Sequence, residues 1–223
     1  MIRPLLKICG LTTPDDARLC YGAGADLLGV IFADSPRQVD VPAALEIRHA
    51  VPLGRLVGVF GDCRVDEVAS VTAATGLDMV QLHDCGDPQR WEAVARAAGV
   101  PVLPAVTADQ AEAAAADMLA RDRLRLAGLL LDLPKSGHVP ADLDPVEHRR
   151  ALWSIARRCG QDGVRVMLAG SLDADNVTAA VAAAVPYGLD VCRGVEASPG
   201  VKDPDEVHRL VDTVRTLEVD HGR

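Results

Sequence analysis

Short apolar runs alternate with helix-forming stretches along the whole chain, and this alternation is the strongest constraint on its fold. Each run is almost continuously apolar, which is typical of parallel strands that helices cover on both faces. Strands are therefore expected at Leu5–Cys9, Leu27–Phe32, Leu56–Phe60, Met79–Leu82, Val100–Pro104, Ala127–Asp132, Val164–Ala169 and Leu189–Cys192.

The stretches between these runs predict helices. The first follows a Thr-Thr-Pro-Asp segment, which is typical of a helix N-terminus. Helices are expected near Asp15–Ala23, Pro42–Ala50, Arg64–Thr75, Pro88–Ala98, Ala108–Arg121, Val146–Arg158, Ala174–Ala184 and Pro204–Leu217.

Eight β/α units within 223 residues predict an α/β protein that forms a (β/α)8 TIM barrel. An open, doubly wound parallel sheet is the alternative. The number of units in so short a chain favours closure, as does the absence of a Gly-x-Gly-x-x-Gly motif after the first strand. Because barrels of roughly 200–250 residues are single domains, we expect one domain over residues 1–219 and a short charged tail at 220–223.

Charge and cysteine usage narrow the possible partners and location. The net charge of −9 argues against a nucleic-acid or anionic-membrane partner. No apolar run approaches the roughly 20 residues that span a membrane, and the N-terminus lacks a signal-peptide pattern. The six cysteines are scattered without a Cys-x-x-Cys pair, which fits reduced thiols better than disulfides or a zinc site. We therefore expect a cytoplasmic protein that binds a small molecule.

A thiol and a carboxyl end two strands that would face each other across the barrel mouth. Cys9 ends the first expected strand and Asp132 the sixth, and the carboxyl ends of all strands meet at one face of a barrel. Such a pair can take a proton from carbon and give one to oxygen, and Lys7 would lower the thiol pKa if it points into the barrel. The alternatives are an inert buried cysteine and an aspartate that caps a helix or lies in a loop.

Two glycine-containing loops predict a phosphate site. Gly170 and Ser171 follow the seventh strand and Gly194 follows the eighth, where barrels often hold phosphate. A short extra helix within Asp190–Lys202 would direct its N-terminus at the anion. The alternative is that the glycines only allow tight turns.

Further polar side chains lie near the expected strand ends. Arg37 follows a proline in a loop, where it would hold a carboxylate with two hydrogen bonds or be an ordinary surface arginine. Gln81 and His83 end the fourth strand, and Asp190 belongs to the eighth. A lone histidine is more often structural, and no carboxylate–histidine pattern indicates a metal.

Several sequence motifs occur together in one known family. They are Lys7–Thr12, Gly29–Phe32, Ser35–Arg37, Val57–Phe60, Val80–His83, Leu129–Asp132, Leu168–Gly170, Asn176–Val177, Gly188–Val191, Gly194–Glu196 and Pro199–Asp203. In this combination the chain resembles the phosphoribosylanthranilate isomerases of tryptophan biosynthesis along nearly its whole length.

The resemblance implies a barrel enzyme without metal or cofactor, which acts as a monomer or homodimer on a small phosphorylated aminosugar. It implies an Amadori rearrangement in which Cys9 removes the C2′ proton as general base. Asp132 would be the general acid that protonates the furanose ring oxygen, and Arg37 would hold the anthranilate carboxylate. The expected substrate contacts are Lys7, Arg37, Gln81, His83 and Asp190, and the expected phosphate contacts are Gly170, Ser171, Arg193 and Gly194.

The chain also departs from the family pattern. The loop at 133–145 has one glycine and three prolines, where the family usually has a Gly-Gly-Thr-Gly segment and an aromatic–Trp pair. Ser171 replaces a glycine, Asp84 replaces a glycine and Arg193 replaces a serine. Arg193 would either add a phosphate contact or fill part of the pocket, and Asp84 would repel an anionic substrate.

Three alternatives to this isomerase follow. A paralogue would keep the acid–base pair but rearrange a different phosphorylated N-glycosylamine. A non-catalytic barrel would only bind phosphate, but it would have no reason to retain both Cys9 and Asp132. A metal-dependent epimerase is disfavoured because the strand ends lack paired histidines and carboxylates.

Overall fold

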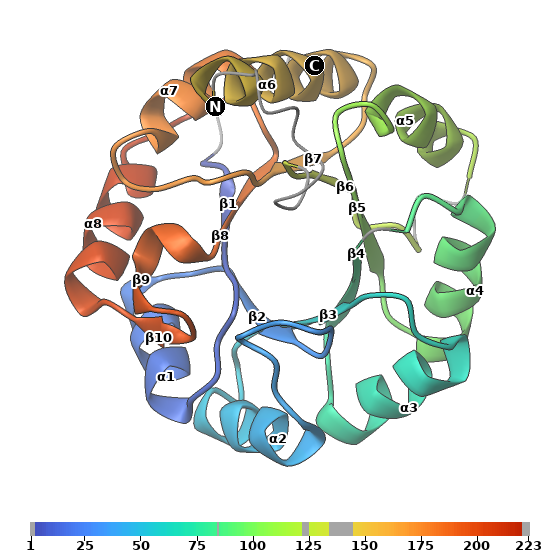
Figure 1. Ribbon diagram of the computed structural model, residues 1–223, viewed down its shortest axis with the longest axis vertical. Coiled ribbons are helices and arrows are strands. Elements are labelled where there is room, and N and C mark those ends of the chain that lie inside the picture. The colour runs from blue at the N-terminus through green and yellow to red at the C-terminus, as the bar shows by residue number, and fades with distance from the viewer. Residues whose placement is uncertain (1–2, 84, 122–124, 134–144, 220–223) are drawn as a thin grey trace.

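The computed structural model describes residues 3–83, 85–121, 125–133 and 145–219. Within them, eight parallel strands close into a barrel in chain order, with the eighth paired to the first (Figure 1). The prediction of a TIM barrel is confirmed, and the open doubly wound sheet is wrong. The strands are β1 Leu5–Ile8, β2 Leu27–Ile31, β3 Leu56–Phe60, β4 Met79–His83, β5 Val102–Val106, β6 Leu129–Leu131, β7 Val166–Leu168 and β8 Gly188–Val191.

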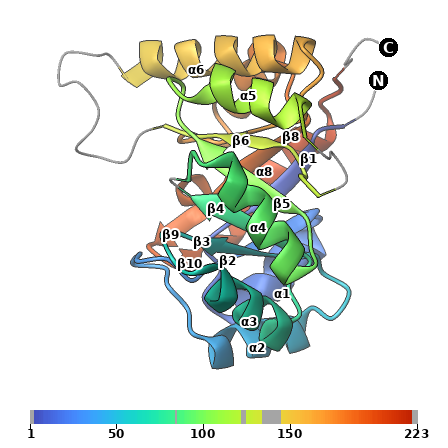
Figure 2. The ribbon, with the colours of Figure 1, turned by 90° about the vertical axis from the view of Figure 1, so that its right-hand side faces the viewer.

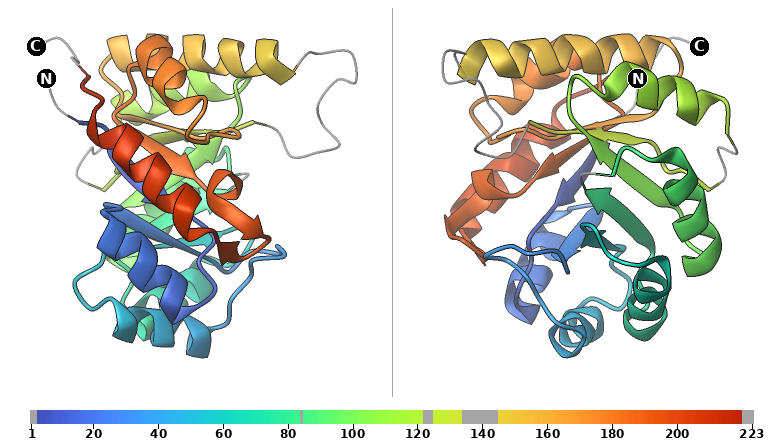
Figure 3. Two further views of the ribbon diagram at one scale, coloured as in Figure 1. Left: turned by 90° about the vertical axis from the view of Figure 1, so that its left-hand side faces the viewer. Right: turned by 45° about the vertical axis from the view of Figure 1, so that its right-hand side comes forward.

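Eight α-helices form the outer ring of the described chain, and side views show α4 and α5 outside β5 (Figures 2 and 3). Thr13, Asp40, Asp87 and Asp203 begin four of them by accepting hydrogen bonds from backbone N–H groups of the first turn. The helices are α1 Pro14–Ala23, α2 Val41–Ala50, α3 Val65–Thr75, α4 Pro88–Ala98, α5 Ala111–Leu119, α6 Pro145–Gln161, α7 Val177–Ala184 and α8 Pro204–Arg215.

Strand boundaries depart from the prediction where an apolar run is longer than the strand. The fifth strand begins at Val102 rather than Val100, because its pairing with β4 runs from Val80↔Val102 to His83↔Ala105. Both β6 and β7 are shorter than their apolar runs. Hydropathy reports burial, whereas hydrogen-bond register decides where a strand begins and ends.

The short extra helix expected within Asp190–Lys202 is reduced to a single 3₁₀ turn. This segment forms a short 3₁₀ turn at Arg193–Val195, followed by an antiparallel hairpin of β9 Glu196–Ser198 and β10 Val201–Lys202. Gly200 adopts a φ of +84° in the hairpin turn, a conformation that a side chain disfavours. The hairpin lies beside α1 (Figure 1), and the Lys202 N–H bonds Asp16 of that helix.

The core has two layers, one between strands and helices and one inside the barrel. On β1, Leu5 packs against the interior cluster, whereas Leu6 and Ile8 face the helices. Because side chains alternate along a strand, Lys7 and Cys9 continue the inward row above Leu5. The interior cluster includes Leu27, Val57, Met79, Leu103, Leu130 and Met167.

None of the described helices combines the length and apolarity required to cross a membrane. The described residues likewise contain no cluster of histidine, cysteine and carboxylate side chains that could hold a metal ion.

Candidate active site

Cys9 lies at the mouth of the barrel, directly after β1. Its N–H donates to Val191 O at 2.8 Å, which extends the pairing of β1 with β8. The residue is 5% exposed. A Cβ on Gly29 of β2 would stand 2.7 Å from Cys9 Sγ, so the glycine leaves room for the thiol.

A buried ion pair lies below the thiol. Lys7 Nζ is 2.8 Å from Asp190 Oδ1, and Lys7 has no exposed surface. Burial by itself lowers the pKa of Lys7, but the interactions with Asp190 and Cys9 together outweigh it and the net pKa is raised, so the amine stays charged. Burial raises the pKa of Cys9, and the net pKa stays raised although the nearby Lys7 charge acts in the opposite direction. Lys7 therefore points into the barrel and favours the thiolate.

Asp132 follows β6 and is partly buried. Its Oδ1 accepts a hydrogen bond from Leu133 N at 2.8 Å. Burial raises the pKa of the carboxyl, while His83 acts in the opposite direction. The raised pKa favours the protonated form that a general acid needs.

Gln81 and His83 lie on β4, in the inward row that begins with Met79 of the interior cluster. Gln81 is 4% exposed, and its Oε1 has no hydrogen-bond partner among the described residues. A buried amide oxygen without a partner is destabilising, so this atom is suited to accept a hydrogen bond from a bound molecule. The influence of His83 on the pKa of Asp132 places that ring close to the carboxyl.

Arg37 is not an ordinary surface arginine. Its Nε and Nη2 donate to Oε1 and Oε2 of Glu196 at 2.7 and 2.6 Å, and its side chain is 13% exposed. The stem of Arg37 passes the turn after Cys9, where a Cβ on Gly10 would stand 2.7 Å from Arg37 Cδ. The ion pair joins the loop after β2 to the hairpin after β8.

Lys202 is a second buried cation that the sequence analysis missed. Its Nζ donates to Cys9 O at 2.6 Å, to Cys192 O at 3.3 Å and to Glu196 Oε1 at 3.1 Å. Both Glu196 and Lys202 lie in the segment that was expected to be a short helix. Two charged residues in a Gly- and Pro-containing segment directly after the last strand were the available signal.

The two predicted phosphate loops are in contact. Gly170 and Ser171 have φ values of +91° and +57°, and a Cβ on Gly194 would stand 2.1 Å from Leu172 O. Arg193 Nη2 donates to Ser171 Oγ at 3.1 Å in an exposed position. Small residues and tight backbone turns therefore bring these four residues together.

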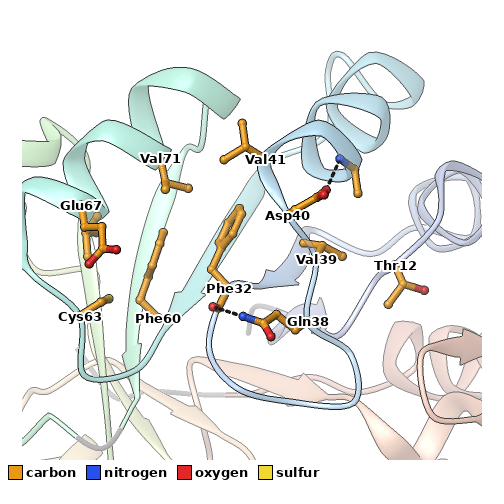
Figure 4. A pocket seen from close by; sticks show the side chains of 12 residues that line it. Thr12, Phe32, Gln38, Val39, Asp40, Val41, Phe60, Cys63, Glu67 and Val71 are labelled. Atoms are coloured by element: carbon orange, nitrogen blue, oxygen red, sulfur yellow. Dashed lines mark hydrogen bonds between the residues drawn. The ribbon is translucent and has the colours of Figure 1, made fainter.

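A cavity of about 730 Å³ lies beside the mouth, between the loop after β2 and α3 (Figure 4). The rings of Phe32 and Phe60 stack in its wall with centroids 5.0 Å apart. Its described lining does not include Cys9, Asp132 or Arg37. The predicted catalytic groups therefore gather at the barrel mouth rather than in this cavity.

Three predicted features lie outside the described residues. One is Asp84, and another is the segment 134–144, which makes up most of the unusual loop at 133–145. The third is the tail expected at 220–223.

Comparisons with known proteins were made against families and against individual chains. The family model described as "N-(5'phosphoribosyl)anthranilate (PRA) isomerase" matches residues 6–213. Among curated relatives, the N-(5'-phosphoribosyl)anthranilate isomerase of Citrifermentans bemidjiense is 38% identical over 218 residues, with 95% of this chain and 97% of the relative covered.

Solved structures are similar in the same way. A phosphoribosyl anthranilate isomerase from Thermus thermophilus is 31% identical with a TM-score of 0.75, over 96% of this chain and all of that chain. A phosphoribosyl anthranilate isomerase in complex with reduced 1-(o-carboxyphenylamino)-1-deoxyribulose 5-phosphate is 26% identical with a TM-score of 0.79, at the same coverage.

Proposed function

The chain belongs to the N-(5'-phosphoribosyl)anthranilate isomerase family, and from that premise we propose how its barrel mouth performs the reaction. It rearranges N-(5-phosphoribosyl)anthranilate, an aminoaldose, into the 1-deoxyribulose 5-phosphate product, an aminoketose. Cys9 is the general base and Asp132 the general acid. The observation that carries this assignment is the placement of a thiol and a carboxyl with a raised pKa at the ends of β1 and β6, around one mouth.

The reaction requires that the protein donate one proton to the substrate and remove another from it. Asp132 gives its proton to the furanose ring oxygen, the bond from C1′ to that oxygen breaks, and the nitrogen lone pair forms a C1′=N double bond. Cys9 then removes the proton from C2′, and the resulting enolamine tautomerises to the aminoketose. The reaction is an isomerisation, so the protons balance. General acid and base each contribute about 10²–10⁴-fold to such a rate.

The ionisation of the pair sets the pH dependence. The active form has a thiolate at Cys9 and a protonated carboxyl at Asp132, although a thiol ordinarily loses its proton at a higher pH than a carboxyl. This form is therefore a minority between the two pKa values. Burial raises the pKa of Asp132, which brings it nearer to that of the thiol. Burial also raises the pKa of Cys9, and the Lys7 charge limits that rise, so Lys7 keeps the two values closer together and increases the active fraction.

The remaining polar groups bind the substrate in this proposal. Arg37 holds the anthranilate carboxylate, and the sugar lies against Lys7, Gln81, His83 and Asp190. The phosphate is held by Gly170, Ser171, Arg193 and Gly194, where close backbone turns and an arginine favour an anion.

The partner in this proposal is a free phosphorylated aminosugar, and the protein acts as a monomer or homodimer in the cytoplasm. All six cysteines are free, which supports a reducing compartment.

A turnover assay with phosphoribosylanthranilate generated in situ, with a chelator present, tests the function. We expect turnover that the chelator does not reduce. Folded protein that binds product analogues without turning over this substrate would favour a different N-glycosylamine, the activity that Arg193 in the phosphate loop motivates. Activity that required an added metal ion would contradict acid–base catalysis by Cys9 and Asp132 alone.

A further inference from the structure

We propose that Glu196 and Lys202 are positioning residues. They orient the guanidinium of Arg37 so that it can bind the carboxylate of the substrate. This inference rests on the proposed function, in which Arg37 holds that carboxylate. Neither residue touches the substrate. Each acts through the guanidinium of Arg37 and through the backbone of Cys9.

Glu196 binds the edge of the Arg37 guanidinium that is formed by Nε and Nη2. It accepts a hydrogen bond from each of these nitrogen atoms. A guanidinium presents its N–H donors as a planar fork, and among the described residues Nη1 of Arg37 donates to no acceptor. The edge formed by Nη1 and Nη2 therefore remains for a second carboxylate, which would bind end-on with two parallel hydrogen bonds.

Lys202 gives the cluster of Arg37, Glu196 and Lys202 a net positive charge. Lys202 has no exposed side-chain surface and Glu196 is 4% exposed, and their charged atoms are 3.1 Å apart. Burial raises the pKa of Glu196, but Arg37 and Lys202 outweigh that effect, so its net pKa is lowered and the carboxylate stays charged. Two cations thus share one carboxylate. The excess positive charge is unfavourable when buried and is neutralised by an incoming carboxylate.

Lys202 also connects this cluster to the catalytic base. Its amine donates to the carbonyl oxygens of Cys9 and Cys192. The hairpin, the end of β1 and the guanidinium of Arg37 therefore form one bonded unit. This unit fixes the distance between the site for the aromatic carboxylate and the thiol that takes the C2′ proton, which is the function of supporting residues in a precise site.

Binding of two matched probes tests the proposal without requiring turnover. One is reduced 1-(o-carboxyphenylamino)-1-deoxyribulose 5-phosphate, and the other is the same molecule with phenyl in place of carboxyphenyl. The readout is the ratio of the two affinities, measured by calorimetry. Wild-type protein should prefer the carboxylate probe about 10- to 100-fold, as expected for a charged bidentate pair.

Two variants keep the net charge of the cluster formed by Arg37, Glu196 and Lys202 but disrupt the two hydrogen bonds between Arg37 and Glu196. Glu196→Asp shortens the carboxylate, and Glu196→Gln/Lys202→Met removes one charge of each sign. Both should reduce the preference, the double variant to about that of Arg37→Ala, while affinity for the phenyl probe stays near wild type. Lys202→Met alone should also reduce the preference, because the remaining Arg37–Glu196 pair is neutral.

Asp26→Asn is the matched control. It removes another arginine–carboxylate pair with two hydrogen bonds, between Arg3 and Asp26 at 2.8 and 2.9 Å, next to the start of β2 and away from the mouth. It should lower thermal stability and leave the preference unchanged.

Three results would overturn the inference. One is wild-type protein without a preference for the carboxylate probe. Another is a preference for the carboxylate probe in both charge-preserving variants that equals that of wild-type protein. This result would mean that the net charge of the cluster is sufficient for the preference, without the positioning of Arg37. The third is an equal loss of affinity for both probes in the variants, which would assign Glu196 and Lys202 a purely structural role. Absence of turnover by wild-type protein that does prefer the carboxylate probe would contradict the proposed function and leave this inference standing.

Discussion

The two sides of the barrel mouth are built differently. On the β1 and β8 side, Cys9 lies among permanently charged groups that are already paired, Lys7 with Asp190 and Lys202 with Glu196. On the β4 and β6 side, the carboxyl of Asp132 has a raised pKa, and the buried amide oxygen of Gln81 is unsatisfied among the described residues.

This difference follows from the ionisation state of the buried groups on each side, which are charged around Cys9 and can be neutral at Asp132. Buried ions require partners, because an unpaired charge in a low dielectric is strongly destabilising. A carboxyl whose pKa is raised can be neutral when buried and needs fewer partners. The side that holds the proposed base is therefore organised before the substrate arrives, whereas the side that holds the proposed acid has polar groups left for the substrate.

Cys9→Ser should lower kcat by about 10²–10⁴-fold, because a hydroxyl is a far weaker base at the same position. Steady-state kinetics and thermal melting check this, and the melting temperature should stay close to wild type. Cys20→Ser is the control. Cys20 is also buried, and burial raises its pKa to about 12, but it lies in α1 and should not affect turnover. Equal activity losses in both variants would contradict the assignment of the base.

Asp132→Asn should also lower kcat by about 10²–10⁴-fold, since the amide cannot supply the proton. It should raise stability at neutral pH. Burial raises the carboxyl pKa, so the folded state binds more protons than the unfolded state, and wild-type stability falls as pH rises from the ordinary value of about 3.9 through the raised value.

Urea unfolding across this pH range checks the second effect of Asp132→Asn. The stability gain should vanish below the ordinary carboxyl pKa, where both forms of residue 132 are neutral. A loss of stability at neutral pH would contradict the view that the charged carboxylate is unfavourable in this position.

Lys7→Met should destabilise the fold by about 3–5 kcal/mol, because it leaves the Asp190 carboxylate buried without its partner. It should also move the alkaline limb of the pH–rate profile upward, since the Lys7 charge lowers the pKa of Cys9. Lys7→Met/Asp190→Asn should recover much of the stability but keep part of the upward shift, because Asp190 itself raises the pKa of Cys9 less than Lys7 lowers it. An unshifted limb would mean that Lys7 is only structural.

Arg193→Met should raise KM by about tenfold with little change in kcat, as expected for the loss of one charged contact to a bound phosphate. The effect should weaken at high salt, because Arg193 lies in an exposed position. A lower KM in the variant would instead indicate that the arginine fills part of the pocket.

The sequence alone predicted the fold because the alternation of strands and helices is a short-range pattern, and eight units in so short a chain favour closure. The ends of the strands then meet at one face, which places the proposed pair Cys9 and Asp132 around the same mouth. The sequence did not predict the hairpin that follows the short 3₁₀ turn within Asp190–Lys202, because this hairpin depends on distant contacts. The hairpin there is anchored by hydrogen bonds from Thr12 to Gly200 and from Lys202 to Cys9.

Local sequence thus predicted the number of β/α units, and it placed the proposed base Cys9 and the proposed acid Asp132 at strand ends. Only the tertiary structure decided how they are supported. Arg37 meets Glu196 across 159 residues, and Lys202 meets the backbone of Cys9 across 193. Such pairs have no sequence period, because the barrel brings its first and last strands side by side and only then places their charged groups within hydrogen-bond distance.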